Sequence, residues 1–340
     1  MSDLTPQITL YAHRGSQPCR AVELTLLLCS LPYEFEQLDF LNGNCRTIEY
    51  FTTLNPTGTV PTIKLSIKKP QDVNKTTSST NVTDEASFVL HESHAIMKFI
   101  CRLSRQSVGA QIEGNGSLHE SLYPSLIFER VATQDNIESK IMNEFFWNPL
   151  KVSALIDQYM DWHHLGIRNH SLPIAHAFVI LENSNLPSNL ILEVIETRIV
   201  PFHTQLKKGL KIIEEYYLRD RQVEERSPSL LLTEPTDDER QQVSSTQSTG
   251  TVSDKIDAFD KIFLCTNKHY TLADLTAGCE LYHLHCHGYP FLELGFERIV
   301  GWFNSLEECV PHFTTVHEDL IKSGKLFKEK YATYLKTMLE

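Results

Sequence analysis

The stretch Ser16–Arg20 (SQPCR) decides the fold, because it joins a predicted first strand, Ile8 to Tyr11, to a predicted first helix, Ala21 to Leu28. A strand–loop–helix connection places the last loop residues at a helix N-terminus. Free backbone N–H groups and the helix dipole favour an anion at such a terminus. The sequence therefore predicts an anion-binding turn close to its N-terminal end.

The same stretch also indicates which anion would suit it. Redox proteins of the thioredoxin-like type place Cys-x-x-Cys at this turn, with a reactive thiolate first. Here the first position is Ser16, so no disulfide can form across the motif. A serine hydroxyl at this point can instead donate a hydrogen bond to a thiolate that a ligand supplies. The alternative is that Ser16 only caps the first helix.

Composition limits the class of protein. A chain of 340 residues, 41% hydrophobic and 22% charged, is typical of a soluble globular protein with two domains. The net charge of −12 argues against nucleic acid or an anionic membrane as a partner. No apolar run reaches the ~20 residues of a membrane-spanning helix, and the eight cysteines show no paired spacing. We therefore expect a cytoplasmic protein with reduced thiols.

Alternating strands and helices fill the first part of the chain. Beyond the first strand and helix, we expect a strand at 33–39, a short helix at 47–51, strands from Val60 and at 88–90, and a helix through Leu103. The intervening segment 68–86 is rich in Lys, Thr, Ser and Asn, which indicates an extended loop. The prediction is an α/β domain over residues 1–104.

The second part reads as helical. A polar segment, 105–122, predicts a linker, and helical periodicity follows at 126–147, 150–168, 172–182 and 187–219. A charged and then Ser/Thr-rich stretch at 220–257 predicts a disordered insertion. Order is expected to resume at Phe263. The predicted architecture is an α/β domain followed by an all-α domain over 123–340, with low-complexity insertions.

Several motifs resemble the soluble glutathione transferases, in particular the theta class. In the first domain these are Ser16–Ala21, Asn55-Pro56-x-Gly58-x-Val60-Pro61 and Leu90-x-Glu92-Ser93-x-Ala95-Ile96; in the second they are Trp162-x-His164-x-x-x-Arg168 and Tyr270–Leu275. The resemblance implies a thioredoxin-like N-terminal domain and a C-terminal helical bundle. It also implies glutathione as co-substrate without a further cofactor, a small hydrophobic electrophile as second substrate, a homodimer, and a role in detoxification.

The resemblance assigns roles to individual residues. Ser16 would polarise the thiol of glutathione. Thr59 and Val60 would bind glutathione through a loop whose Val60-Pro61 bond is cis, as in strand addition. Glu92 would accept from the ligand's ammonium group, and Ser93 would bind its γ-glutamyl carboxylate at a helix N-terminus.

Two basic residues complete the predicted site. Arg168 would stabilise negative charge on the thiolate or leaving group, although a surface salt bridge is an equally good interpretation of an arginine on a helix. Arg46 would bind the glycine end of glutathione. The theta class carries histidine where this chain has Cys45, so a glutathione conjugate is an alternative ligand, and Cys45 could form a mixed disulfide.

Two further motifs favour structural roles. Thr271-Leu272-Ala273-Asp274 is a capping box at a helix start. His283 and His287 share a helix face, but no third metal ligand is indicated, so we predict no metal site.

Three functions remain open at this point. The first is a glutathione transferase that catalyses conjugation, dehalogenation or peroxide reduction. The second is a non-catalytic transferase-fold module that binds proteins or ligands, which the insertions favour. The third is a thiol–disulfide oxidoreductase using Cys19, which the second position of that residue in the motif disfavours.

Overall fold

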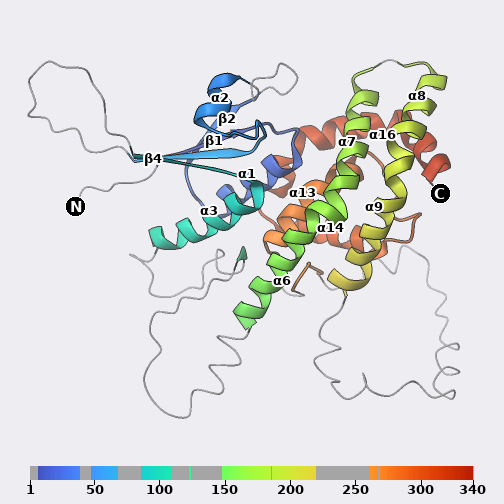
Figure 1. The fold of residues 1–340 in the computed structure, drawn as a ribbon. Coiled ribbons are helices and arrows are strands. Elements are labelled where there is room, and N and C mark those ends of the chain that lie inside the picture. Colours follow the sequence, from blue (N-terminus) through green and yellow to red (C-terminus); the bar gives the residue numbers. More distant parts are fainter. Residues whose placement is uncertain are drawn as a thin grey trace, which may run out of the picture.

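The computed structural model describes residues 7–38, 47–67, 86–108, 122–123, 148–184, 186–219, 261–266 and 269–339 (Figure 1). Four strands form one mixed sheet in the order β2-β1-β3-β4. Strand β1 (Gln7–Ala12) pairs in parallel with β2 (Tyr33–Gln37) and antiparallel with β3 (Thr62–Ile67), which pairs antiparallel with β4 (Ala86–His91). The predicted α/β domain is confirmed as a thioredoxin-like sheet.

Helices cover both faces of this sheet. Helices α1 (Gln17–Leu28) and α3 (Ser93–Val108) pack against each other, and α2 (Ile48–Thr53) lies on the opposite side of the sheet from α3 (Figure 1). Helix α1 begins four residues before the predicted start at Ala21. Pro18 explains this difference, because proline is well tolerated in the first turn of a helix. Helix α3 also runs further than predicted, to Val108, inside the segment expected to be a linker.

The rest of the described chain is helical, as predicted. Its elements are α6 (Asn148–His163), η3 (His164–Arg168), α7 (Asn169–Glu182), α8 (Ser188–Val194), η4 (Ile195–Ile199), α9 (Val200–Ile212), η5 (Ile213–Tyr217), α13 (Leu272–Cys286), α14 (Glu297–Cys309), α15 (Phe313–Val316) and α16 (Glu318–Leu339). The three η elements are π-helical turns within longer helical runs. Among the described residues, no helix is both long and apolar enough to cross a membrane.

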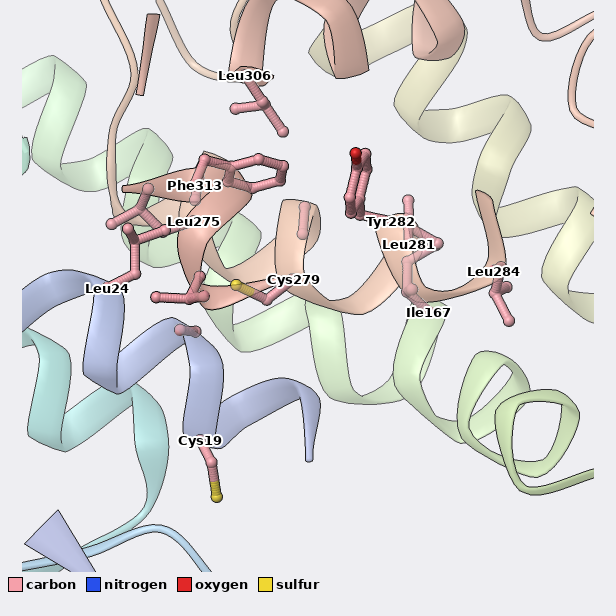
Figure 2. Packing of buried hydrophobic residues seen from close by; sticks show 14 of the residues in the cluster. Cys19, Leu24, Ile167, Leu275, Cys279, Leu281, Tyr282, Leu284, Leu306 and Phe313 are labelled. Atoms are coloured by element: carbon pink, nitrogen blue, oxygen red, sulfur yellow. The ribbon is translucent and has the colours of Figure 1, made fainter. Parts of the chain in front are cut away.

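Helix α13 is the centre of the core. Nearly all of its side chains are buried, and it packs against α1, α6, α7 and α16. Figure 2 shows Leu275 of α13 beside Leu24 of α1, with Phe313 and Leu306 on the far side of α13. Helix α13 therefore joins the helical part to the sheet-containing part through α1. Ser16 is the N-cap residue of this same helix α1.

The start of α13 is held by the predicted capping box. The carboxylate of Asp274 accepts hydrogen bonds from the backbone N–H of Thr271 at 2.8 Å and of Leu264 at 2.7 Å. It also accepts from the Thr271 hydroxyl at 2.9 Å and from Nε1 of Trp302 at 3.0 Å. Burial nevertheless raises the pKa of Asp274 to about 7, since four donors only partly offset the loss of water.

Several predictions lie wholly or largely outside the described residues. These are the loop at 68–86 except Ala86, the helix at 126–147 and the insertion at 220–257, together with Arg46 and Cys45. Most of the predicted linker, residues 109–121, lies outside them too.

Candidate functional site

Ser16 occupies the N-cap position of α1, directly after the loop that leaves β1. Its backbone N–H donates to the carbonyl oxygen of His13 at 2.9 Å, and its own carbonyl accepts from the N–H of Arg20. Its side chain makes no capping hydrogen bond; instead it lies at the thiol of Cys19. The Ser16 side chain therefore does not cap α1, although the residue stands at the N-cap position.

Cys19 points away from α13, on the side of α1 that faces the sheet (Figure 2). Burial raises the pKa of this thiol to about 11, although the Ser16 hydroxyl and the charges of Arg20 and Arg168 favour the thiolate. A thiol with such a pKa is protonated at neutral pH and is a poor nucleophile.

The loop before β3 is held by a buried asparagine and a tyrosine. The side-chain nitrogen of Asn55 donates to the carbonyl oxygen of Thr59 at 2.8 Å, and the hydroxyl of Tyr50 donates to the same oxygen at 2.8 Å. The peptide bond between Val60 and Pro61 is cis, as the resemblance implied. The Asn-Pro-x-Gly turn thus presents Thr59 and Val60 at a defined place beside the sheet.

The connection between β4 and α3 has an unusual backbone. Glu92 adopts φ 73°, in the left-handed region that few residues other than glycine favour. Its carbonyl oxygen accepts from the N–H of Ile96, and Ser93 is the first residue of α3. Such strained positions cluster at functional sites. The side chain of Glu92 is exposed, whereas Ser93 is buried.

Arg168 ends the π-helical turn η3 and forms an ion pair with Glu280 of α13, with 2.6 Å between Nη1 and Oε2. The Ser171 hydroxyl donates to the other carboxylate oxygen of Glu280 at 2.6 Å, and Nε2 of His163 lies 4.0 Å from Oε2. π-Helical turns are frequent at functional sites. Arg168 thus forms an ion pair, but with a buried carboxylate and not with one at the surface.

Close backbone packing holds this turn in place. A Cβ atom on Gly209 of α9 would lie 2.3 Å from the carbonyl oxygen of Gly166, in the middle of η3. Only glycine at position 209 therefore permits α9 to approach the turn that carries Arg168.

Neutral histidines surround the guanidinium. The rings of His94 and His164 stack with centroids 4.4 Å apart. Burial lowers the pKa of His94 to about 3, and the nearby charges of Lys98 and Arg168 act in the same direction. Burial also lowers the pKa values of His163 and His164, and for both the charge of Arg168 contributes. These rings can donate and accept hydrogen bonds beside Arg168 without adding charge at neutral pH.

Most of the predicted site residues line one cavity of about 250 Å³. Its walls are formed by Pro18, Thr59, Val60, Pro61, Glu92, Ser93, His164 and Arg168. They come from the start of α1, the loop before β3, the start of α3 and η3. Ser16 is not part of this wall, but it lies two residues before Pro18. The remaining predicted site residue, Arg46, lies outside the described part of the chain.

The sequence missed Glu280. The available signal was a carboxylate in the middle of the apolar run of α13, beyond the capping residue Asp274, since a buried charge needs a partner. The rings of His283 and His287 stack at 4.9 Å. Within the described ranges, no group of three or more His, Cys, Asp or Glu side chains is arranged to hold a metal ion.

Comparison with known proteins shows which family this chain is similar to. Residues 16–103 match the family model described as glutathione S-transferase, N-terminal domain. The theta-like resemblance is confirmed. The theta-1 glutathione S-transferase of Bos taurus is 21% identical over 318 residues, which cover 93% of this chain and 90% of that protein.

Solved structures show the same fold. The apo form of human glutathione S-transferase T1-1 aligns with a TM-score of 0.54 at 20% identity, covering 98% of this chain and 100% of that chain. Human glutathione transferase theta-2, solved in complex with glutathione and an unknown ligand, aligns with a TM-score of 0.53 at 19% identity, covering 98% of this chain and 97% of the other. This theta-like chain therefore has the glutathione transferase fold.

Proposed function

We propose that the chain is a glutathione transferase in which Ser16 stabilises the thiolate of bound glutathione for attack on an electrophile. One observation carries this proposal: residues from three segments far apart in the sequence, 59–61, 92–93 and 168, meet in one cavity beside the start of α1. The similarity to theta-class transferases over nearly the whole chain supports the same activity.

The geometry supports a division of roles. Ser93, at the N-terminus of α3, would bind the γ-glutamyl carboxylate, and Glu92 would pair with the adjacent ammonium group. The main chain of Val60 would hydrogen-bond the ligand's peptide backbone, next to Thr59, and Arg46 would bind its glycine carboxylate. Arg168 would stabilise the developing negative charge.

Activation of the thiol needs a moderate amount of energy. A free thiol has a pKa near 8.5, and lowering it by ~2 units requires about 2.7 kcal/mol of preferential stabilisation of the thiolate. A hydrogen bond from the Ser16 hydroxyl together with the N-terminus of α1 is sufficient. The thiol proton leaves to solvent, and the sulfur lone pair then forms the bond to the electrophile while the leaving group departs with its electron pair. No further cofactor enters these steps, and a homodimer is proposed from the family likeness.

The test is glutathione binding by calorimetry, with the pKa of the bound thiol followed by ultraviolet absorbance. We expect wild type to bind with a lowered thiol pKa, and Ser16→Ala to lose the lowering. Ser153→Ala is the matched control, because the hydroxyl of this partly buried serine on α6 donates only to the backbone of its own helix, and it leaves both values unchanged. Absence of binding at millimolar glutathione would overturn the proposal and favour the non-catalytic module.

The high pKa of Cys19 disfavours the thiol–disulfide oxidoreductase. The same assay tests this alternative, because Cys19→Ala leaves glutathione binding and thiol activation in place under our proposal.

A further inference from the structure

We infer that Glu280 is a positioning residue, which holds the guanidinium of Arg168 at the wall of the cavity through a buried ion pair. This inference rests on the proposed function, because it concerns how a residue of that site is oriented. Glu280 lies 112 positions after Arg168 and belongs to the central helix of the core.

The two partners differ in exposure. The side chain of Glu280 is 2% exposed and that of Arg168 is 21% exposed. The carboxylate therefore lies behind the guanidinium, and the guanidinium lies between it and the cavity. A surface ion pair would expose both groups and fix neither side chain.

Both oxygens of Glu280 are engaged. Oε2 accepts from Nη1 of Arg168, and Oε1 accepts from the hydroxyl of Ser171, one turn further along the same helical run. Two anchors prevent rotation of the carboxylate and so define the position of Nη1. Since the guanidinium is planar, fixing one of its nitrogens against a fixed carboxylate restricts the direction of the others. Arg168 makes no other hydrogen bond to the described residues, so its remaining N–H groups are available to a ligand.

Stability alone does not account for this arrangement. A buried ion pair is on average no more stabilising than apolar side chains of the same volume, because both charges lose water. The ion pair can instead serve catalysis by holding Arg168 in one orientation. A preorganised cation needs no reorganisation when negative charge develops on the ligand.

A double-mutant cycle tests the inference. The variants are Glu280→Gln, Arg168→Met and the double variant, each measured for kcat with glutathione and an aryl halide, and for glutathione Kd. We expect Glu280→Gln to lower kcat at least tenfold with Kd changed less than twofold, and to cause less than a twofold further loss in the Arg168→Met background. Losses that multiply in the double variant, or an unchanged kcat in Glu280→Gln, would overturn the inference.

Two further variants separate positioning from folding. Ser171→Ala frees one oxygen of Glu280 without removing a charge, and we expect a smaller, roughly threefold loss of kcat. Glu214→Gln alters another partly buried carboxylate, which accepts from the N–H groups of Arg298 and Ile299 and does not line the cavity. We expect this control to lower the thermal midpoint while leaving kcat within twofold of wild type.

A nuclear magnetic resonance measurement keeps the inference independent of activity. The Nε–H signal of Arg168, assigned by its loss in Arg168→Met, should be sharp and shifted in wild type and should move to the position of solvent-exposed arginines in Glu280→Gln. If wild type does not bind glutathione, the proposed function is wrong. The Arg168 signal still tests the ion pair in that case, because it is measured without a ligand. An Arg168 signal that does not respond to Glu280→Gln would overturn the positioning role.

Discussion

Arg20 donates a hydrogen bond from Nη2 to the carbonyl oxygen of Cys279, across 3.1 Å and between α1 and α13. Its Nη1 donates to the carbonyl oxygen of Arg14, in the loop that precedes Ser16, at 2.8 Å. Cys279 directly precedes Glu280, the partner of Arg168. Two consecutive residues of α13 thus contact two parts of the candidate site. Cys279 is linked through Arg20 to the loop before Ser16, and Glu280 is paired with Arg168.

The first prediction concerns the buried guanidinium of Arg20. We expect Arg20→Met to lower the free energy of unfolding by about 2–4 kcal/mol, because it removes the two charged hydrogen bonds that join the Arg14 loop to the middle of α13. Urea unfolding measures this change. Arg198→Met, at an exposed position on η4, is the matched control and should change stability by no more than about 0.5 kcal/mol. Equal effects of the two substitutions would show that Arg20 is not a structural connection.

The second prediction concerns the strained backbone at Glu92. Glycine adopts φ 73° without penalty, so we expect Glu92→Gly to raise the free energy of unfolding by up to about 1 kcal/mol while weakening glutathione binding. Glu92→Gln keeps the strain and should weaken binding without a gain in stability. Thermal unfolding and calorimetry measure both effects. A loss of stability in Glu92→Gly would contradict the argument.

The third prediction concerns the packing behind Arg168. A Cβ atom at position 209 would lie 2.3 Å from the carbonyl oxygen of Gly166, so we expect Gly209→Ala to destabilise the protein by about 1–3 kcal/mol and to lower kcat. Gly301→Ala on α14 is the control. Its nearest neighbour would lie 3.9 Å away, and alanine in a helix interior should stabilise by about 0.5–1 kcal/mol. Opposite signs for the two substitutions would confirm the close approach of α9 to η3.

The fourth prediction concerns acid. Burial lowers the pKa of His94 to about 3 and of His285 to about 4, and lowers those of His163, His283 and His317 well below the usual value. When the pH falls below about 6.5, the unfolded chain binds protons that the folded chain does not. The stability these neutral rings contribute is therefore fully present above pH 6.5 and is lost as the pH falls through the range down to about 3.

Asp274 acts in the opposite direction, because its pKa of about 7 lets the folded state bind a proton first between about pH 4 and 7. Five histidines outweigh this one carboxyl group, so stability falls towards acid. Each histidine contributes about 1.4 kcal/mol per pH unit at most. Urea unfolding at pH 7.5 and 5.5 measures the slope. His285→Phe, which keeps a ring against Phe303, should reduce the slope by the contribution of one proton; an unchanged slope would contradict the assignment.

Local patterns predicted most of the fold. Alternation of apolar residues located β1 and β2, and turn residues located the loop before β3, since these signals lie within a few neighbouring residues. The start of α1 was misplaced because Gln17–Arg20 show no apolar periodicity, and their helical state depends on Pro18 at the first turn. The end of α3 was also misplaced, because Val108 lies in a polar run.

Contacts between residues far apart in the chain could not be predicted from the sequence. Thr59, Glu92, Ser93 and Arg168 were predicted through motif resemblance, whereas Glu280 carries no local signal of its partner. The ion pair joins positions 112 residues apart, and only the packing of α13 against α6 and α7 brings them together. The stacking of His94 on His164 is unreadable for the same reason.

The contact between Gly209 and Gly166 limits how this site can diversify. Two main chains approach closely there, so a larger residue at position 209 would push α9 away from the turn that carries Arg168. Adaptation to other ligands must act through the remaining walls, formed by the start of α1, the loop at 59–61 and the start of α3. We therefore expect the position of the turn that carries Arg168 to be fixed, and the residues near the sheet to be the ones that can change.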